Sequence, residues 1–156
     1  MIYLIEFFVA MVATISFAIL FNAPKKEIFY CGFSGAITWI VYYIITKNGG
    51  HSILASLIAT FCLTILCRCF AVLRKSPVTI YLLPGIFPLV PGAGIYYTAY
   101  YLFIGNNEMF GFKGLETVEI AGAIVFGIIF GFGLPQGIFD QLSREKHNKN
   151  VIKENI

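Results

Sequence analysis

The side chains whose spacing suits chemistry form a polar stripe in an otherwise apolar segment. Four hydroxyls and one guanidinium recur at every fourth residue: Ser52, Ser56, Thr60, Thr64 and Arg68. Because a helix turns about 100° per residue, a spacing of four keeps them on one slowly winding face. In a membrane such a face turns toward other helices or water, so the stripe could line a solute path and end at an anion-binding arginine. Alternatively, each hydroxyl bonds to a carbonyl of its own helix and Arg68 extends to the interface.

The second candidate is a stretch of backbone. Three prolines and two glycines fall within the apolar segment 84–92: Pro84, Gly85, Pro88, Pro91 and Gly92. Proline removes a backbone donor and clashes with the preceding turn, so the segment predicts irregular backbone. Irregular backbone at membrane depth is tolerated where protein buries it or where it lines a cavity, and transporters bind substrates there. A helix restarting near Gly92 would aim its amides at a carboxylate. The simpler alternative is a structural kink.

The sequence contains no recognisable catalytic set. The two histidines, His51 and His147, fall in separate predicted loops, and no HExxH, G-x-S-x-G or P-loop pattern occurs. The four cysteines lie in or at the ends of apolar runs and lack the paired spacing of a zinc site. We therefore expect neither an enzyme nor a bound metal or cofactor.

Membrane-spanning helices must position these groups. The chain is 58% hydrophobic and 12% charged, whereas soluble domains carry about 25% charged residues. The sequence contains apolar runs of about 20 residues, which are long enough to cross a hydrocarbon core of about 30 Å. They predict an all-α integral membrane domain over 1–139 with five transmembrane helices, at about 2–21, 28–46, 52–73, 78–104 and 117–139. The Pro/Gly segment should interrupt the fourth helix. Residues 105–116 should form a polar loop, and 140–156 a charged tail.

The distribution of basic residues predicts the orientation. With five crossings, nine of the eleven lysines and arginines fall on the side that contains Lys25, Lys26 and the tail. Only Lys47 and Lys113 fall on the other side. The positive-inside rule then places the C-terminus in the cytoplasm and the N-terminus outside. Membrane orientation thus accounts for the net charge of +3 without nucleic-acid binding.

The remaining motifs suggest helix packing and interfacial charges. Gly32 and Gly35 give the second run a small-residue face, and the last run contains the pairs Gly127/Gly131 and Gly133/Gly137. This spacing lets helices approach closely. We interpret three carboxylates, Glu6, Glu116 and Glu119, as interfacial; for Glu6 a proton-carrying role is the alternative.

The two proline motifs, with their neighbours, resemble the threonine/serine exporter family. The matching residues are Phe21-Asn22-Ala23-Pro24, Lys75-Ser76-Pro77, the segment 84–92 followed by Tyr96, Tyr97 and Thr98, and the Gly-Leu-Pro sequence ending at Pro135. The proline-rich segment is the specific part. The likeness extends over essentially the whole chain and is to the family's small, separately encoded, YjjB-like subunit.

The resemblance implies a multi-pass protein of the bacterial inner or plasma membrane. Its expected function is proton-driven export of small carboxylate-bearing metabolites, either threonine and serine or a dicarboxylate such as succinate. A larger YjjP-like membrane subunit would complete the transporter, and a homo-oligomer is possible. Asn22, Pro24 and the segment 84–92 are the positions that match the family's motifs most clearly. The resemblance implies a structural role for Asn22 and Pro24. The alternative is a structural or regulatory subunit that scaffolds the partner without transporting.

Overall fold

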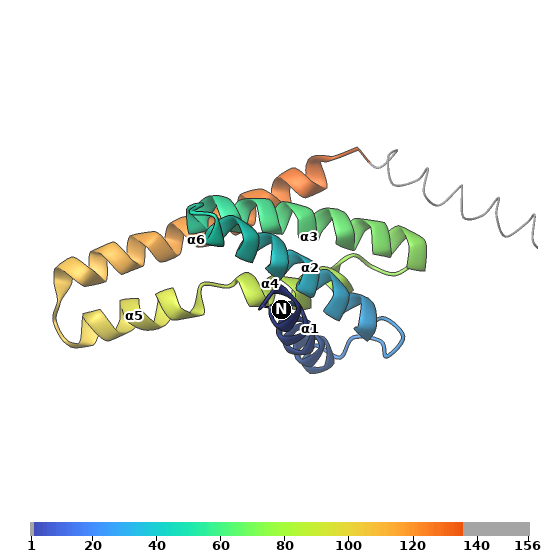
Figure 1. The fold of residues 1–156 in the computed structure, drawn as a ribbon, viewed down its shortest axis with the longest axis horizontal. Coiled ribbons are helices and arrows are strands. Elements are labelled where there is room, and N and C mark those ends of the chain that lie inside the picture. The colour runs from blue at the N-terminus through green and yellow to red at the C-terminus, as the bar shows by residue number, and fades with distance from the viewer. Residues whose placement is uncertain (1, 136–156) are drawn as a thin grey trace, which may run out of the picture.

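The computed structural model describes residues 2–135, which form helices joined by short connections (Figure 1). The elements are α1 (Ile2–Leu20), α2 (Ile28–Lys47), α3 (Ser52–Arg74), α4 (Thr79–Ile86), the 3-10 turn η1 (Phe87–Leu89), α5 (Gly92–Phe103) and α6 (Asn107–Gly133). Four of these helices are long and apolar enough to cross a membrane, and there are five candidate crossings if α4–η1 and α5 are counted together as one bent span. The prediction of an all-α membrane protein with an interrupted fourth crossing is confirmed.

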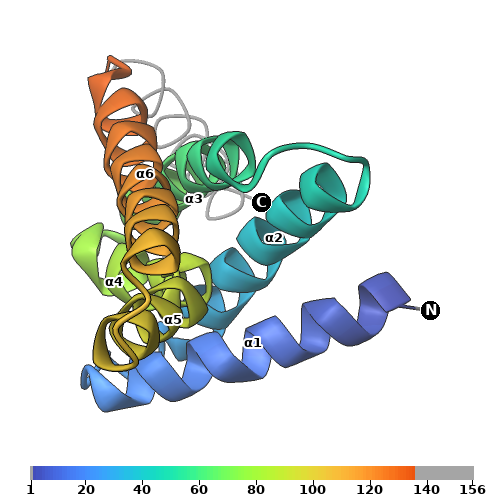
Figure 2. The same cartoon turned by 90° about the vertical axis from the view of Figure 1, so that its left-hand side faces the viewer.

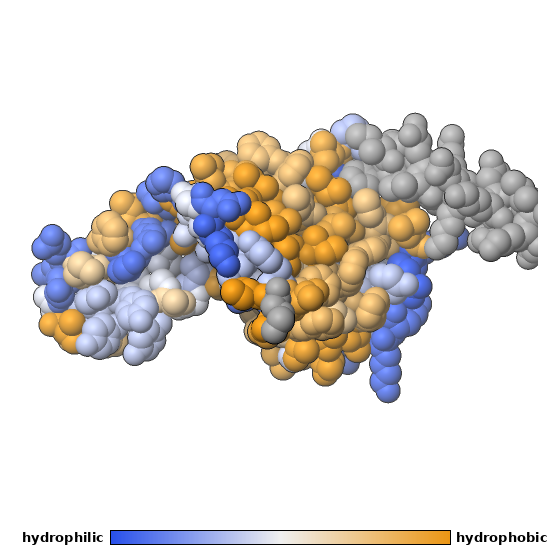
Figure 3. Space-filling model, in the orientation of Figure 1, coloured by the Kyte–Doolittle hydropathy of each residue, from blue (hydrophilic) through white to orange (hydrophobic). Residues whose placement is uncertain are grey.

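The first three predicted spans coincide with α1, α2 and α3 to within one residue at each end. The expected tail at 140–156, the last part of the fifth span and Gly137 lie outside the described residues. The sidedness of the termini stays a prediction. Figure 3 shows that apolar surface covers the body of the molecule, while hydrophilic surface gathers over the projecting hairpin of α5 and α6.

Small residues bring α1 and α2 together, side by side in Figure 2. Ala10, Thr14 and Ala18 are the buried residues of α1 and share one face because they are four apart. They meet the small-residue face of α2, where a Cβ added at Gly35 would overlap the Thr14 side chain. The small-residue face predicted for the second run is thus a helix contact.

A second small-residue contact joins α3 to α6. A Cβ added at Gly127 would lie 2.7 Å from the Leu57 carbonyl oxygen, and one at Gly131 would lie 2.5 Å from Thr64 Cβ. The helices can approach this closely only because glycine has no side chain there. The packing role predicted for Gly127/Gly131 is confirmed, whereas Gly133 faces open space.

The fourth crossing is irregular over a shorter stretch than 84–92. Pro84 and Gly85 lie inside α4, and the chain bends by 51° between η1 and α5. Proline at 84 leaves the carbonyl of Ile80 without its helical donor. The Cys31 thiol of α2 donates to that oxygen at 3.3 Å. A neighbouring helix therefore replaces the missing bond, which is how membrane helices tolerate proline.

The polar loop predicted over 105–116 is wrong, because α6 begins at Asn107. The connection is a tight turn in which Gly105 has φ +75°. Asn106 caps the helix by accepting a hydrogen bond from the Met109 amide at 3.1 Å. With 27 residues, α6 is about 40 Å long and exceeds the hydrocarbon core, so it accommodates polar residues in its first turns. Figure 1 shows this part projecting with α5 as a hairpin.

A carboxylate with no exposed surface ties three elements together. Glu27, in the connection between α1 and α2, accepts bonds from Arg74 Nε at 3.0 Å, Arg74 Nη2 at 3.2 Å and Tyr81 Oη at 2.7 Å. Arg74 ends α3 and Tyr81 lies in α4, so the group fixes α4 to the body. The hydrogen bonds from Arg74 hold the pKa of Glu27 below its ordinary value of 4.5, outweighing the opposing effect of burial.

We expect Cys31→Val to lower the free energy of unfolding in detergent by about 1 kcal/mol, because it leaves the Ile80 carbonyl unpaired. Cys31→Ser retains a donor and serves as the matched control. Equal stability of the two variants would contradict the proposed compensation for Pro84.

We expect Glu27→Gln to lower the thermal unfolding midpoint at pH 7, whereas Glu119→Gln, at an exposed position, should leave it unchanged. The lowered pKa in the folded state means that the carboxylate stabilises the fold above its ordinary pKa. This contribution disappears as the pH falls through the folded-state value. The difference between wild type and Glu27→Gln should therefore shrink below about pH 4. A difference that is constant with pH would contradict this role.

Candidate functional site

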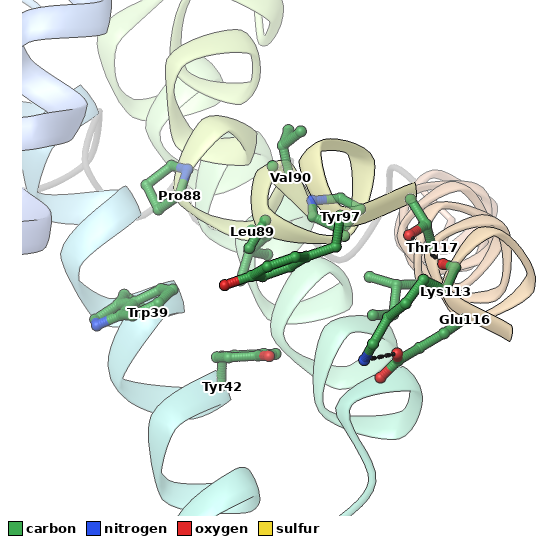
Figure 4. Close-up of a pocket in the computed structure, with 14 residues that line it drawn as sticks. Trp39, Tyr42, Pro88, Leu89, Val90, Tyr97, Lys113, Glu116 and Thr117 are labelled. Atoms are coloured by element: carbon green, nitrogen blue, oxygen red, sulfur yellow. Dashed lines mark hydrogen bonds and ion pairs between the residues drawn. The ribbon is translucent and has the colours of Figure 1, made fainter. Parts of the chain in front are cut away.

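A cavity of about 380 Å³ opens where η1 gives way to α5. Figure 4 shows its three walls, which are the backbone of the break, an aromatic group from α2 and α5, and polar side chains of α6. The lining residues are Trp39, Tyr42, the segment 88–94, Tyr97, Lys113, Glu116, Thr117 and Ile120. Its volume and largely apolar lining with a few polar groups are typical of sites for small metabolites.

The wall formed by the break presents the start of a helix. Val90 and Pro91 leave the helical conformation, with ψ angles of 128° and 61°. The Gly92 amide donates to the Val90 carbonyl at 2.7 Å, and regular helix bonds resume with Ile95 donating to Pro91 at 3.0 Å. No side chain caps this helix. The amides of Ala93 and Gly94, between these two donors, have no intrahelical acceptor and give this wall a positive end that suits an anion.

Gly94 sets the distance between α5 and the α6 wall. A Cβ at this position would overlap the hydroxyl of Thr117, so only glycine lets the two helices meet here. The Thr117 hydroxyl itself donates to the Lys113 carbonyl at 2.7 Å. By contrast, a Cβ at Gly92 would have no neighbour within 4 Å. A side chain introduced there would enter the cavity.

The wall formed by α6 carries one cation and one anion. Lys113 Nζ lies 2.7 Å from Glu116 Oε2, and the two side chains are 31% and 41% exposed. The residues are three apart and therefore neighbours on the helix surface. Figure 4 shows the Lys113 side chain extending from α6 toward Tyr42 of α2, with Glu116 beside it.

The aromatic wall is held from behind by Glu6. Trp39 Nε1 donates to Glu6 Oε2 at 2.8 Å, so the indole N–H points to α1 and the ring forms the cavity wall. Tyr42 stacks on Trp39 with ring centroids 5.4 Å apart. In Figure 4 the hydroxyls of Tyr42 and Tyr97 point into the space between Trp39 and Lys113. Glu6 therefore contacts the cavity lining through Trp39 without lining the cavity itself. Its interfacial position stays a prediction.

The break residues predicted from sequence divide between two places. Pro88, Pro91 and Gly92 line the cavity. Gly85 instead packs on Leu63, where an added Cβ would lie 2.7 Å from Cδ1. Pro84 lines a separate hollow of about 230 Å³ together with Asn22 and Pro24, the two positions expected to be structural. The Asn22–Pro24 motif therefore meets the first proline of the segment 84–92 in a hollow that is separate from the cavity.

The polar stripe of α3 is buried against α6 and does not reach the cavity lining. Thr60 donates to the Ser56 carbonyl, and Thr64 donates to the Thr60 carbonyl at 2.9 Å. Arg68 donates to the carbonyls of Gly131 and Leu134, both at 2.8 Å, where α6 ends. Thr60 and Thr64 thus follow the alternative in which the hydroxyls bond to their own helix, whereas the buried Ser56 hydroxyl has no hydrogen-bond partner among the described residues. Arg68 caps a neighbouring helix. Their role in a solute path stays a prediction.

Sequence reasoning missed the aromatic and charged walls. Trp39, Tyr42 and Tyr97 were not singled out as site residues, and Glu116 was interpreted only as an interfacial helix start. The available signal was the spacing of three between Trp39 and Tyr42 and between Lys113 and Glu116, which puts each pair on one helix face. The spacing of Lys113 and Glu116 indicates a shared face only if both lie in a helix, and a loop was predicted over residues 105–116.

Helices that span the membrane, one of them bent, and a cavity at the bend are the architecture typical of secondary transporters. The family model for the threonine/serine exporter, ThrE, matches residues 6–132, and the chain belongs to this family. The matched range contains every residue that lines the cavity. Because this is a family of transporters, the chain is a multi-pass membrane transport protein. No curated protein and no solved structure matches the chain.

We expect Arg68→Met to lower the free energy of unfolding by about 1.5–3 kcal/mol, because it removes charged hydrogen bonds to the end of α6. Lys47→Met, at an exposed helix end, should have little effect. The two variants should keep the solute preference of the wild type. A changed preference in Arg68→Met with unchanged stability would show that Arg68 contacts the solute.

Proposed function

We propose that this chain is a subunit of a secondary exporter for small carboxylate-bearing metabolites, and that the cavity forms part of the solute path. Threonine and serine, or a dicarboxylate such as succinate, are the proposed solutes. The observation that carries the proposal is that the uncapped start of α5 and the Lys113 ammonium line the same cavity. Together they offer positive charge from two sides to one carboxylate.

The bend also suggests how access to the cavity could alternate. Tyr81 and Gly85 hold α4 to the body, through Glu27 and Leu63. In contrast, α5 has no buried residue and packs mainly against α6. The two halves of the fourth crossing are therefore held by different neighbours. Movement between them at Val90 and Pro91 would open the cavity toward one side of the membrane or the other.

The proposal includes a larger partner subunit and a bacterial inner or plasma membrane location, with the proton gradient as the driving force. Exposed apolar side chains are numerous on α5, including Ile95, Leu102 and Phe103. Lipid or another protein subunit would cover such a surface. A chain of this length also encloses its cavity only partly, which is consistent with a path completed by other subunits. A second copy of the chain is the alternative partner.

Efflux of labelled threonine and of labelled succinate from loaded cells tests this function. The cells express the chain with its larger neighbouring subunit. We expect Gly92→Leu, alone or combined with Pro88→Ala, to reduce efflux of the transported solute to near the background of cells without the chain. The leucine side chain would occupy the cavity, because Gly92 faces open space within it.

Gly122→Leu is the matched control. Gly122 also faces open space but lies on α6 outside the cavity lining, so efflux should be retained at equal protein level. Efflux by Gly92→Leu that equals the control would contradict a solute path through the cavity. That result would favour the alternative of a scaffolding subunit.

A further inference from the structure

The ion pair on α6 has unused capacity to bind a ligand. An ammonium carries three donors, and a carboxylate can accept several hydrogen bonds. The mutual contact of Lys113 and Glu116 at 2.7 Å occupies only part of this capacity. The helix carries two further carboxylates, Glu108 and Glu119, and these are exposed and do not line the cavity. The two opposite charges that do line it are therefore set apart from the other charges of α6.

We propose that Lys113 and Glu116 select solutes that carry an ammonium and a carboxylate close together, and that they disfavour dicarboxylates. This inference rests on the proposed function of the cavity. The solute carboxylate would bind between Lys113 and the start of α5. Its ammonium would bind Glu116.

Charge balance explains the selection. A zwitterion exchanges partners with the ion pair, so each charge keeps an opposite charge beside it and no unpaired charge is buried. A dicarboxylate brings a second negative charge toward Glu116, where like charges repel. The phenol groups of Tyr42 and Tyr97 add neutral donors on the opposite side and do not offset that repulsion.

The position of Glu116 supports a role in solute passage. Glu116 lines the cavity and also a neighbouring hollow of about 290 Å³. The other residues of that hollow, from Gly49 to Ile53, belong to the connection between α2 and α3 and to the first two positions of α3. This carboxylate therefore lies where the cavity meets the end of the molecule formed by that connection. A solute moving between the two spaces would pass it.

The variant test compares Glu116→Gln with Glu119→Gln in the full chain, expressed with its larger neighbouring subunit. Cells are loaded with labelled L-threonine or labelled succinate, and both effluxes are measured at equal protein level. We expect Glu116→Gln to lower the ratio of threonine to succinate efflux about tenfold, because it removes a charged contact to the ammonium. Glu119→Gln should leave the ratio unchanged. An unchanged ratio in Glu116→Gln would overturn the inference.

The outcomes for wild type separate the two proposals. Efflux of succinate but not threonine would overturn the charge selection while leaving the exporter function in place. Efflux of neither solute would overturn the exporter function and the selection with it.

A second measurement needs no variant. The purified wild-type complex is heated with L-threonine or with N-acetyl-L-threonine, which lacks the ammonium charge. Ligand binding to the folded state raises the unfolding midpoint. We expect a rise with threonine and none with the acetylated compound at the same concentration. An equal rise with both compounds would overturn the role of Glu116.

Discussion

The structure depends on how the protein satisfies backbone groups in an interior that contains no water to bind them. Where Pro84 frees the Ile80 carbonyl, the Cys31 thiol of a neighbouring helix donates to it. Where α6 ends, Arg68 reaches across from α3 to the last carbonyls. The start of α5, after Pro91, has no side-chain cap within residues 2–135, as is also true of the starts of α2, α3 and α4, but it lies in the cavity wall. The first amides of this helix therefore lie beside a space that a ligand acceptor could fill.

Much of the fold could be predicted because lipid imposes simple requirements on length and polarity. The apolar runs located α1, α2 and α3 closely, and the prolines located the bend to within a few residues. The start of α6 could not be placed in this way, since a helix that extends beyond the hydrocarbon core may carry polar residues. Asn106 was a capping signal, but the polar composition around it favoured a loop.

The candidate site was only partly predictable because it depends on which helix faces meet. Pro88, Pro91 and Gly92 could be identified from local chemistry alone. The contribution of Trp39 and Lys113 depends on the path of α2 and α6 past the bend, which periodicity does not determine. The polar stripe illustrates the same point: its burial followed from its spacing, but its neighbour is the glycine face of α6.

The burial of Glu27 also constrains the order in which the chain can assemble. Glu27 is synthesised long before Arg74 and Tyr81, its partners in the folded protein. Until α3 and the first half of the bent crossing have been inserted, its carboxylate must remain in contact with water or lipid headgroups. The contact that joins the connection between α1 and α2 to α3 and α4 can therefore form only after those later segments have been made. A fragment that ends before α3 would leave Glu27 without Arg74 and Tyr81, so we expect α1 and α2 to pack less stably alone than in the intact chain.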